Sequence, residues 1–468
     1  MIIEQIYTGC LAQGAYYIES AGEVAIIDPL REVEGYLEKA AKKNAKIKYI
    51  FETHFHADFV SGHVTLAEKS EAKIVFGPSA KTTFEAIVAA DNEVFQVGNI
   101  TITALHTPGH TMESTCYLLK DEKGKDHAIF SGDTLFLGDV GRPDLAQKGD
   151  VTEKDLAGLL FDSLRNKVMP LADDVIVYPA HGAGSACGKN LSKETVGILG
   201  NQKKTNYALR ADMTKEEFIK EVTNGLLPPP AYFPLNVKLN KEGYQSIDEV
   251  IKKSARPLSV IDFELAANET DALILDVRHQ TEFVKGFIPN SIFIGLGGTF
   301  APWVGALIKD ITQPILLVTP VGEEETAITR LSRVGFDNVL GYLEGGFLSW
   351  QNANKEEDTL VSVSPEFLAQ KVKENALVFD VRKPGEYASE HVKVAENTPL
   401  DFLNNHIAAF PKDQDFYVHC AGGYRSVIAS SILKARGYHN VIDVTGGYDA
   451  IQKTTIEKTA AVCPSTLK

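Results

Sequence analysis

Residues 53–63 read THFHADFVSGH and directly follow the strand-like run IKYIF. In an extended chain, side chains two residues apart point to the same side, so His54 and His56 can face one site. Further polar residues follow later β-like runs, where loops usually carry chemistry. We expect them to converge on one metal, and a scatter of unrelated surface histidines is the competing interpretation. These later residues are His110 in TPGH, Asp133 in SGD and His181 in PAH.

This set of motifs resembles the metallo-β-lactamase superfamily, whose signature is HxHxDH followed by a later His, Asp and His. The resemblance covers nearly all of residues 1–240 and implies an αβ/βα sandwich with metal at the edge of two β-sheets. Dinuclear hydrolases of the superfamily, such as glyoxalase II, have a histidine directly after the aspartate that corresponds to Asp58, and this histidine holds a second ion. Here that position is Phe59, whose ring cannot bind metal, so we expect a single ion.

The motifs THFHADF, TPGHT, SGDTLF, GRPD and PAHGAGS together resemble the persulfide dioxygenase branch. That branch implies mononuclear non-haem Fe(II), and two imidazoles with one carboxylate form the facial triad that suits this ion. A three-histidine site that includes His56 is left open. The resemblance implies three metal ligands (His54, His110 and Asp133) and three residues that orient them or serve as alternative ligands (His56, Asp58 and His181).

The same branch implies oxidation of a low-molecular-weight persulfide, RSSH, by O₂ and water to sulfite and a thiol. The thiol would be glutathione, coenzyme A or a similar molecule. Arg142, in GRPD, is a candidate for binding the anionic substrate, and an ordinary salt bridge to Asp144 is the competing interpretation. Cys187, in HGAGSACGK, is either a reactive thiol close to the metal or inert packing.

The rest of the chain repeats itself. ALILDVRHQTEF (272–283) matches ALVFDVRKPGEY (376–387), and RVGFDNVLGYLEGGFLSW (333–350) matches ARGYHNVIDVTGGYDAIQ (435–452). Strand-like and helix-like pieces alternate at a nearly constant offset. The pattern predicts two copies of one α/β domain.

The last copy contains VHCAGGYRS (418–426), between a β-like run and a helical run. Backbone N–H groups and the positive end of a helix favour the thiolate of Cys420, and Arg425 adds a cation for an anionic substrate. With FDVRKPGEY and VTGGYDA around it, this loop resembles the rhodanese family, and its CxxxxR spacing favours sulfur transfer over phosphate hydrolysis. The remaining candidates for substrate binding are Gly422, Gly423 and Tyr424.

The middle copy lacks this cysteine. Its equivalent stretch, LLVTPVGEEETAITRL (316–331), carries a hydroxyl, a proline and carboxylates that cannot hold a persulfide. We interpret it as an inactive copy that serves for spacing or binding.

Composition restricts the functional classes. The 468 residues include 47 Lys and Arg against 62 Asp and Glu, a net charge of −15 that argues against nucleic acid and membrane surfaces as partners. The start MIIEQIYTGC does not resemble a leader, and no run is long and apolar enough to cross a bilayer, so we expect a cytoplasmic protein. Five cysteines suit free thiols. A homo-oligomer is left open.

These observations predict an α/β protein in which a metallo-β-lactamase sandwich precedes two rhodanese-like domains with parallel sheets. The expected function is persulfide oxidation coupled to sulfur transfer at Cys420, which forms or consumes thiosulfate. One alternative is a zinc thioester hydrolase resembling glyoxalase II, and another treats the rhodanese copies as docking modules without catalysis. The predicted domains are 1–245 (dioxygenase), 246–356 (inactive rhodanese-like) and 357–468 (active rhodanese).

Overall fold

The computed structural model describes residues 1–145, 151–189 and 191–462, and the chain forms two compact units. The first consists mainly of residues 1–247. Cys10, Cys116, Cys187 and Cys420 are free thiols, and Cys463 lies outside the described residues. In the part of the chain that the structure describes, no helix combines the length and the apolar composition that a membrane span requires.

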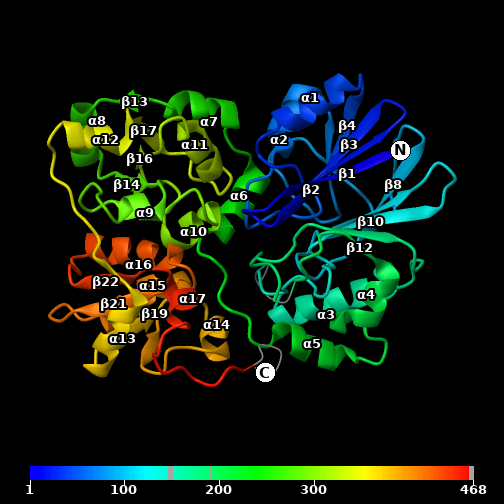
Figure 1. Cartoon of the computed structure of the whole chain (residues 1–468). Helices are drawn as coiled ribbons and strands as arrows, with labels where there is room; N and C mark the ends of the chain where they lie inside the picture. The colour runs from blue at the N-terminus through cyan, green and yellow to red at the C-terminus, as the bar shows by residue number, and fades with distance from the viewer. Residues whose placement is uncertain (146–150, 190, 463–468) are drawn as a thin grey trace. The chain divides into compact units, whose positions relative to one another are not determined.

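Two six-stranded sheets form the first unit, and Figure 1 shows them with helices on their outer sides. The first sheet has the order β1-β2-β3-β4-β5-β6 and the second the order β12-β11-β10-β9-β8-β7. The strands of the first sheet are β1 (Ile2–Thr8), β2 (Gln13–Ser20), β3 (Glu23–Ile27), β4 (Lys46–Phe51), β5 (Lys73–Phe76) and β6 (Ile87–Val88). Those of the second are β7 (Val94–Val97), β8 (Ile100–His106), β9 (Thr115–Lys120), β10 (Asp126–Gly132), β11 (Ile176–Pro179) and β12 (Gly197–Ile198).

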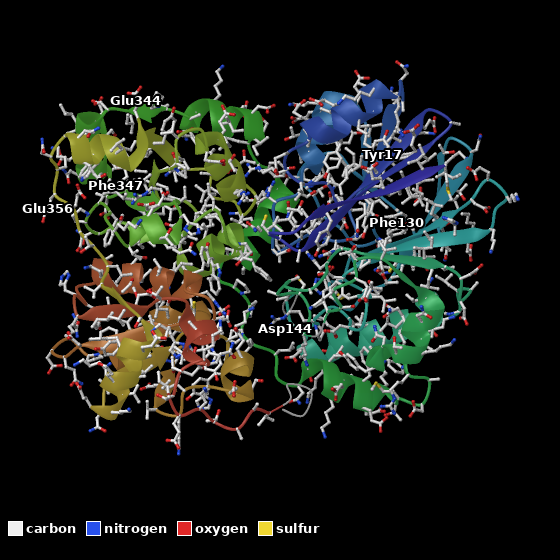
Figure 2. All side chains as sticks on the ribbon, in the orientation of Figure 1. Tyr17, Phe130, Asp144, Glu344, Phe347 and Glu356 are labelled. Atoms are coloured by element: carbon white, nitrogen blue, oxygen red, sulfur yellow. The ribbon has the colours of Figure 1, made fainter. Side chains whose placement is uncertain are left out.

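Alternation along the strands divides the apolar residues between two faces. Phe130 on β10 belongs to the core between the sheets, where its ring packs edge-on against Tyr16 of β2 at 5.0 Å (Figure 2). Tyr17, the next residue of β2, faces the helices on the other side of the first sheet. The result is the αβ/βα sandwich that the sequence predicts.

Helices cover both outer faces of this sandwich (Figure 1). α1 (Glu34–Lys42) and α2 (His63–Ser70) pack on the first sheet. The second sheet is covered by α3 (Glu153–Ser163), the π-helical turn Leu164–Val168, α4 (Leu199–Thr205), the 3₁₀ turn Tyr207–Leu209 and α5 (Lys215–Thr223). α6 (Phe233–Glu242) follows after the proline-rich segment.

The second unit contains two parallel five-stranded sheets with the same strand order, β13-β17-β16-β14-β15 and β18-β22-β21-β19-β20. The predicted repeat is therefore confirmed at the level of topology. The strands of the middle domain are β13 (Pro257–Leu258), β14 (Leu273–Asp276), β15 (Ile292–Phe293), β16 (Ile315–Val318) and β17 (Val339–Leu343). Those of the last domain are β18 (Ser362–Val363), β19 (Leu377–Asp380), β20 (Ala395–Asn397), β21 (Phe416–His419) and β22 (Val441–Val444).

Helices connect these parallel strands, as crossover connections require. Phe347 is part of the middle domain's buried core together with Phe263 and Trp350 (Figure 2). The middle domain has α7 (Ile247–Ser254), α8 (Val260–Thr270), α9 (Gln280–Phe283), α10 (Phe300–Leu307), α11 (Glu324–Ser332) and α12 (Gly346–Asn352). The last domain has α13 (Pro365–Lys373), α14 (Pro384–Ser389), α15 (Leu403–His406) between 3₁₀ turns at Leu400–Phe402 and Ile407–Ala409, α16 (Tyr424–Ala435) and α17 (Gly447–Ile451).

Candidate metal centre and cysteine loop

Buried polar side chains of the first unit gather where four strands end. Each of these side chains comes from a loop at the end of a strand, where binding and catalytic residues usually lie. The structure brings together all six of the residues that the sequence singles out as ligands or their partners. His54, His56 and Asp58 follow β4, His110 lies between β8 and β9, Asp133 follows β10, and His181 follows β11.

Asp133 lies at the centre of this cluster. Its Oδ2 is 3.4 Å from Nε2 of His110 and 3.9 Å from Nε2 of His54, and its Oδ1 is 3.6 Å from Nε2 of His181. All four side chains are at most 2% exposed. One ligand atom each from His54, His110 and Asp133 can be chosen so that the three lie within 4.8 Å of one another, close enough to share one cation.

Hydrogen bonds fix the tautomer of His54. The Thr53 hydroxyl donates to Oδ2 of Asp28 at 2.8 Å, so its oxygen is left to accept from Nδ1 of His54 at 3.0 Å. The proton of His54 therefore resides on Nδ1, and the lone pair of Nε2 faces Asp133. A partner that holds the distal nitrogen in this way is typical of metal-binding histidines.

The other two imidazoles that face Asp133 are oriented in the same way. Nδ1 of His110 donates to the carbonyl of Arg142 at 2.9 Å, and Nδ1 of His181 donates to the carbonyl of Ala12 at 3.3 Å. A carbonyl can only accept, so both rings carry their proton on Nδ1 and present Nε2 to the cluster.

The cluster has the electronic properties of a metal site. Burial lowers the pKa of His54 well below its usual value, and the neighbouring histidines lower it further, which keeps the imidazole neutral. Neither oxygen of Asp133 has a hydrogen-bond partner among the described residues, although both are buried. A buried carboxylate without partners is costly unless a cation accompanies it. The residues present therefore fit a divalent ion.

His56, Asp58 and His181 form an adjoining group whose ligand atoms also lie within 4.8 Å of one another. Nε2 of His56, however, is 3.1 Å from Asp28 and 3.5 Å from Glu52, on the side of these carboxylates. Burial disfavours the charged form of His56, but the two carboxylates raise its pKa to about 9. Phe59 is fully buried, and its ring lies 4.4 Å from that of His56.

Helix α6 holds the loop that carries these ligands. Nδ2 of Asn240 donates to the carbonyls of His56 and Phe59, both at 2.8 Å, and its Oδ1 accepts from the N–H of Ser61 at 2.9 Å. These bonds satisfy backbone groups that are buried outside any sheet, as such groups require. The HxHxD loop is therefore held by contacts within the protein that do not require a metal.

Gly141 of the GRPD motif packs directly against two ligands. Its N–H donates to the carbonyl of Asp133 at 2.9 Å. A Cβ at this position would lie 2.1 Å from that carbonyl oxygen and 3.0 Å from Nδ1 of His110. Only glycine allows this approach.

The guanidinium of Arg142 is occupied within the protein. It forms two bonds to Asp144, at 2.7 and 2.6 Å, and also donates to the carbonyls of Ala186 and Leu227. This geometry corresponds to the salt-bridge interpretation. Cys187 lies close to the cluster, with its Sγ within 4.8 Å of ligand atoms of Asp133 and His181. Burial raises the pKa of its thiol well above the usual value, and nearby carboxylates raise it further.

A second candidate site lies in the last domain, between β21 and α16. Cys420 directly follows β21, is 1% exposed, and its Sγ accepts a hydrogen bond from the N–H of Gly423 at 3.1 Å. Gly423 has a φ of 98°, a conformation that glycine adopts without strain. A backbone donor aimed at the sulfur stabilises a thiolate or persulfide anion.

Arg425 and Tyr424 leave this loop in different directions. Arg425 makes a two-bond ion pair with Glu386 of α14, at 2.6 and 2.8 Å, and this cation holds the pKa of Glu386 below its usual value against the effect of burial. Tyr424 donates its hydroxyl to the carbonyl of Gly295, in the middle domain, at 2.6 Å. Gly422 lies in the loop itself, near Asp449.

The middle domain keeps the same loop scaffold without the sulfur. Thr319 directly follows β16, as Cys420 follows β21, and Gly322 has a φ of 92°, close to that of Gly423. The N–H of Gly322 donates to the carboxylate of Glu324, at 2.9 and 3.1 Å. A carboxylate thus takes the donor that binds sulfur in the last domain.

Sequence reasoning missed several residues that position these sites. Asp28 ends the apolar run EVAIID, a signal that could have found it. Asn240 carries no local signal, because its role depends on α6 packing against a loop some 180 positions earlier. Glu386 lies in the repeated DVRKPGEY segment but does not stand out there.

Fold and site together define an αβ/βα sandwich with a candidate metal site, followed by an α/β repeat whose last copy carries a cysteine. The model of the metallo-beta-lactamase superfamily matches residues 8–181, and the model of the rhodanese-like domain matches residues 260–353 and 364–454. The chain is also similar to the crystal structure of a metallo-beta-lactamase from Staphylococcus aureus subsp. aureus COL. That likeness has 30% identity and a TM-score of 0.64, and it covers 73% of this chain and 98% of the other. The chain therefore belongs to the metallo-β-lactamase superfamily, with two rhodanese-like domains appended.

Other relatives match the first unit. The structure of ETHE1 from Myxococcus xanthus is 28% identical, covers 52% of this chain and 98% of that one, and has a TM-score of 0.44. A probable hydroxyacylglutathione hydrolase, glo2, of Schizosaccharomyces pombe is 34% identical over 34% of this chain. A cytoplasmic hydroxyacylglutathione hydrolase of Arabidopsis thaliana is 34% identical over 28% of this chain. The chain spans 58% and 53% of the length of these two curated relatives.

Proposed function

We propose that the chain is an iron-dependent persulfide dioxygenase coupled to a sulfurtransferase. The first unit would oxidise a low-molecular-weight persulfide with O₂ and water to a thiol and sulfite. The observation that carries the proposal is the buried triad of His54, His110 and Asp133, combined with Phe59 at the position where the dinuclear hydrolases have a metal-binding histidine. Two imidazoles and one carboxylate leave coordination positions for substrate and O₂.

Under this proposal His54, His110 and Asp133 would hold Fe(II), which supplies the capacity to bind a soft sulfur donor and O₂ together. The hydrogen bonds from the rings to Thr53 and to the Arg142 carbonyl keep both Nε2 lone pairs directed at one point. His56, Asp58 and His181 would orient ligands and solvent. Burial of the whole cluster excludes bulk water from a reactive sulfur intermediate.

In the last domain, Cys420 would carry sulfane sulfur as a persulfide. Transfer of that sulfur to sulfite forms the S–S bond of thiosulfate and returns the Cys420 thiolate; the reverse reaction would consume thiosulfate. The N–H of Gly423 stabilises the anionic sulfur in both states. Because both sites belong to one chain, sulfite made at the first is produced at a high effective concentration for the second.

The 34% identity to hydroxyacylglutathione hydrolases favours a second candidate, a zinc enzyme that hydrolyses a glutathione thioester. Such an enzyme would use metal-bound hydroxide and no O₂. The two candidates differ in the metal and in the co-substrate, and glutathione persulfide and a glutathione thioester allow both to be tested with the same thiol.

One experiment separates them. The protein is stripped of metal, loaded anaerobically with Fe(II) or with Zn(II), and given either glutathione persulfide or a hydroxyacylglutathione thioester. Oxygen uptake and sulfite formation with the iron protein alone would support the dioxygenase. Thioester hydrolysis by the zinc protein, without oxygen uptake by either form, would overturn it in favour of the hydrolase.

A further inference from the structure

The residue after Gly423 connects the cysteine loop to the neighbouring domain. Gly423 donates its N–H to Cys420 Sγ, and Tyr424 follows it as the first residue of α16. The Tyr424 side chain points away from the loop, and its hydroxyl donates to the carbonyl of Gly295 at 2.6 Å. Gly295 lies two residues after β15 of the middle domain. The backbone that presents a donor to the sulfur is therefore held from outside its own domain.

The contact is closely packed. The Tyr424 ring meets that of Phe293 edge-on, with 5.9 Å between centroids. A Cβ on Gly298 would lie 2.4–2.8 Å from three atoms of the Tyr424 ring, so no other residue fits there. Tyr424 is largely buried, and this burial raises the pKa of its hydroxyl, which remains a donor.

A second bond holds the same helix farther along. β15 is an edge strand of its sheet, and edge strands leave backbone groups without strand partners. The outward N–H of Phe293 donates to Oγ of Ser431 at 3.0 Å. Ser431 is seven residues after Tyr424, on the same face of α16. Two points on one helix face therefore fix both its position and its rotation against β15.

The middle domain has no tyrosine at the position equivalent to Tyr424. The middle domain's counterpart of Tyr424, one residue after Gly322, is Glu323, which has neither a ring nor a hydroxyl. The loop of the middle domain therefore lacks a tyrosine that could make the equivalent contact.

From these contacts we infer that the middle domain acts as a support for the cysteine loop, with Tyr424 as the positioning residue through which it acts. In this role Tyr424 acts through the loop: its bond to Gly295 keeps the Gly423 N–H aimed at Sγ of Cys420. The inference rests on the proposed sulfurtransferase function of Cys420. The inference gives the middle domain a structural role that does not require a catalytic residue of its own.

The test uses the full-length protein with Tyr424→Phe, which removes the hydroxyl, and Tyr424→Ala, which also removes the ring. Two quantities are measured: kcat and KM for sulfur transfer from thiosulfate to cyanide, and the pH profile of iodoacetamide modification on the Cys420 peptide, followed by mass spectrometry. A hydrogen bond lost by the thiolate raises the thiol pKa. For Tyr424→Ala we expect the midpoint to rise by about one unit and kcat to fall about tenfold, with a smaller change for Tyr424→Phe.

Tyr438→Phe is the matched control, because Tyr438 donates to the carbonyl of Ile407 within the last domain, at 3.0 Å. It should leave both quantities unchanged. Gly298→Ala approaches the same contact from the middle domain and should shift the midpoint in the direction of the Tyr424 variants. Unchanged midpoints in folded Tyr424→Ala and Gly298→Ala proteins would overturn the inference. A wild-type protein without sulfur transfer would overturn the proposed function instead, while the alkylation profile still tests the support.

Discussion

Glu324 of the middle domain and Arg425 of the last domain occupy equivalent positions in their loops. Glu324 lies five residues after Thr319, and Arg425 lies five residues after Cys420. Their charges are opposite. Arg425 pairs with Glu386 and leaves the Gly423 N–H for sulfur, whereas the Glu324 carboxylate itself accepts from the equivalent Gly322 N–H. Two features therefore support the prediction that the middle copy is inactive: it lacks the thiol, and the N–H that would bind an anion is already occupied.

Because the middle copy lacks the thiol and its Gly322 N–H is occupied by Glu324, we predict that two substitutions are needed for it to carry a persulfide. In a Cys420→Ser background, Thr319→Cys alone should not carry a persulfide, because Glu324 still competes for the donor and repels an anion. Thr319→Cys combined with Glu324→Arg should acquire measurable persulfide on the introduced thiol. Mass spectrometry after incubation with thiosulfate detects it. Equal labelling of the single and double variants would show that Glu324 does not block the loop.

Thr53 connects Asp28 to a proposed metal ligand. Thr53→Val keeps the volume and removes the hydroxyl that orients His54. Loss of such an outer partner typically costs 10–100-fold in metal affinity, and we expect a decrease of about that size for Fe(II). Anaerobic competition with a chromogenic chelator measures it.

The control for this experiment is Thr223→Val on α5, whose hydroxyl bonds only to a carbonyl of its own helix, at 2.7 Å. It should bind Fe(II) like the wild type. An unchanged affinity in Thr53→Val would mean that His54 is held by packing alone or is not a ligand.

Phe59 is the residue on which the single-metal hypothesis depends. Its ring lies against His56, next to Asp58 and His181, so an imidazole there would complete a second set of donors. We expect Phe59→His to raise the metal content of the saturated protein from one ion per chain to two, measured by elemental analysis. Two ions in the wild type would contradict the proposed mononuclear site.

Residues that lie within short motifs at strand ends are the ones whose proximity can be predicted from the sequence. His54 and His56 are two residues apart, and Cys420 and Arg425 are five apart, so local spacing places them without knowledge of the tertiary structure. The fold class is confirmed for the same reason, since each motif implies its strand and its loop. The assignment of ligands, the domain limits at 245 and 356, and the choice of metal remain predictions.

Other features depend on packing that a linear pattern does not contain. The place of Tyr424 in the loop makes it a candidate for substrate binding, and no local pattern predicts the bond of its hydroxyl to a glycine carbonyl 129 positions away. Arg142 was a candidate for the same role, and its guanidinium is paired with Asp144. In both cases the direction of the side chain is set by the partners that surround it in the fold.

A buried carboxylate in the last domain predicts a pH-dependent stability. Asp443 on β22 is 3% exposed, and burial raises its pKa from 3.8 to about 6, although a hydrogen bond from the Ser362 hydroxyl opposes the increase. Well below pH 3.8 the group is protonated in both the folded and the unfolded protein and contributes nothing. As the pH rises toward 6, the Asp443 carboxyl ionises more readily in the unfolded chain than in the folded protein. The free energy of unfolding therefore decreases, by up to ~3 kcal/mol above pH 6.

Asp443→Asn mimics the protonated side chain and should remove this cost. We expect the variant to melt about 5–10 °C higher than the wild type at pH 7 and to differ from it much less at pH 4, as measured by calorimetry. Asp415→Asn, an exposed aspartate of the same domain, is the control and should have no effect at either pH. Because only a difference that grows between pH 4 and 6 reports the buried carboxylate, equal stabilisation at both pH values would attribute the effect to packing instead.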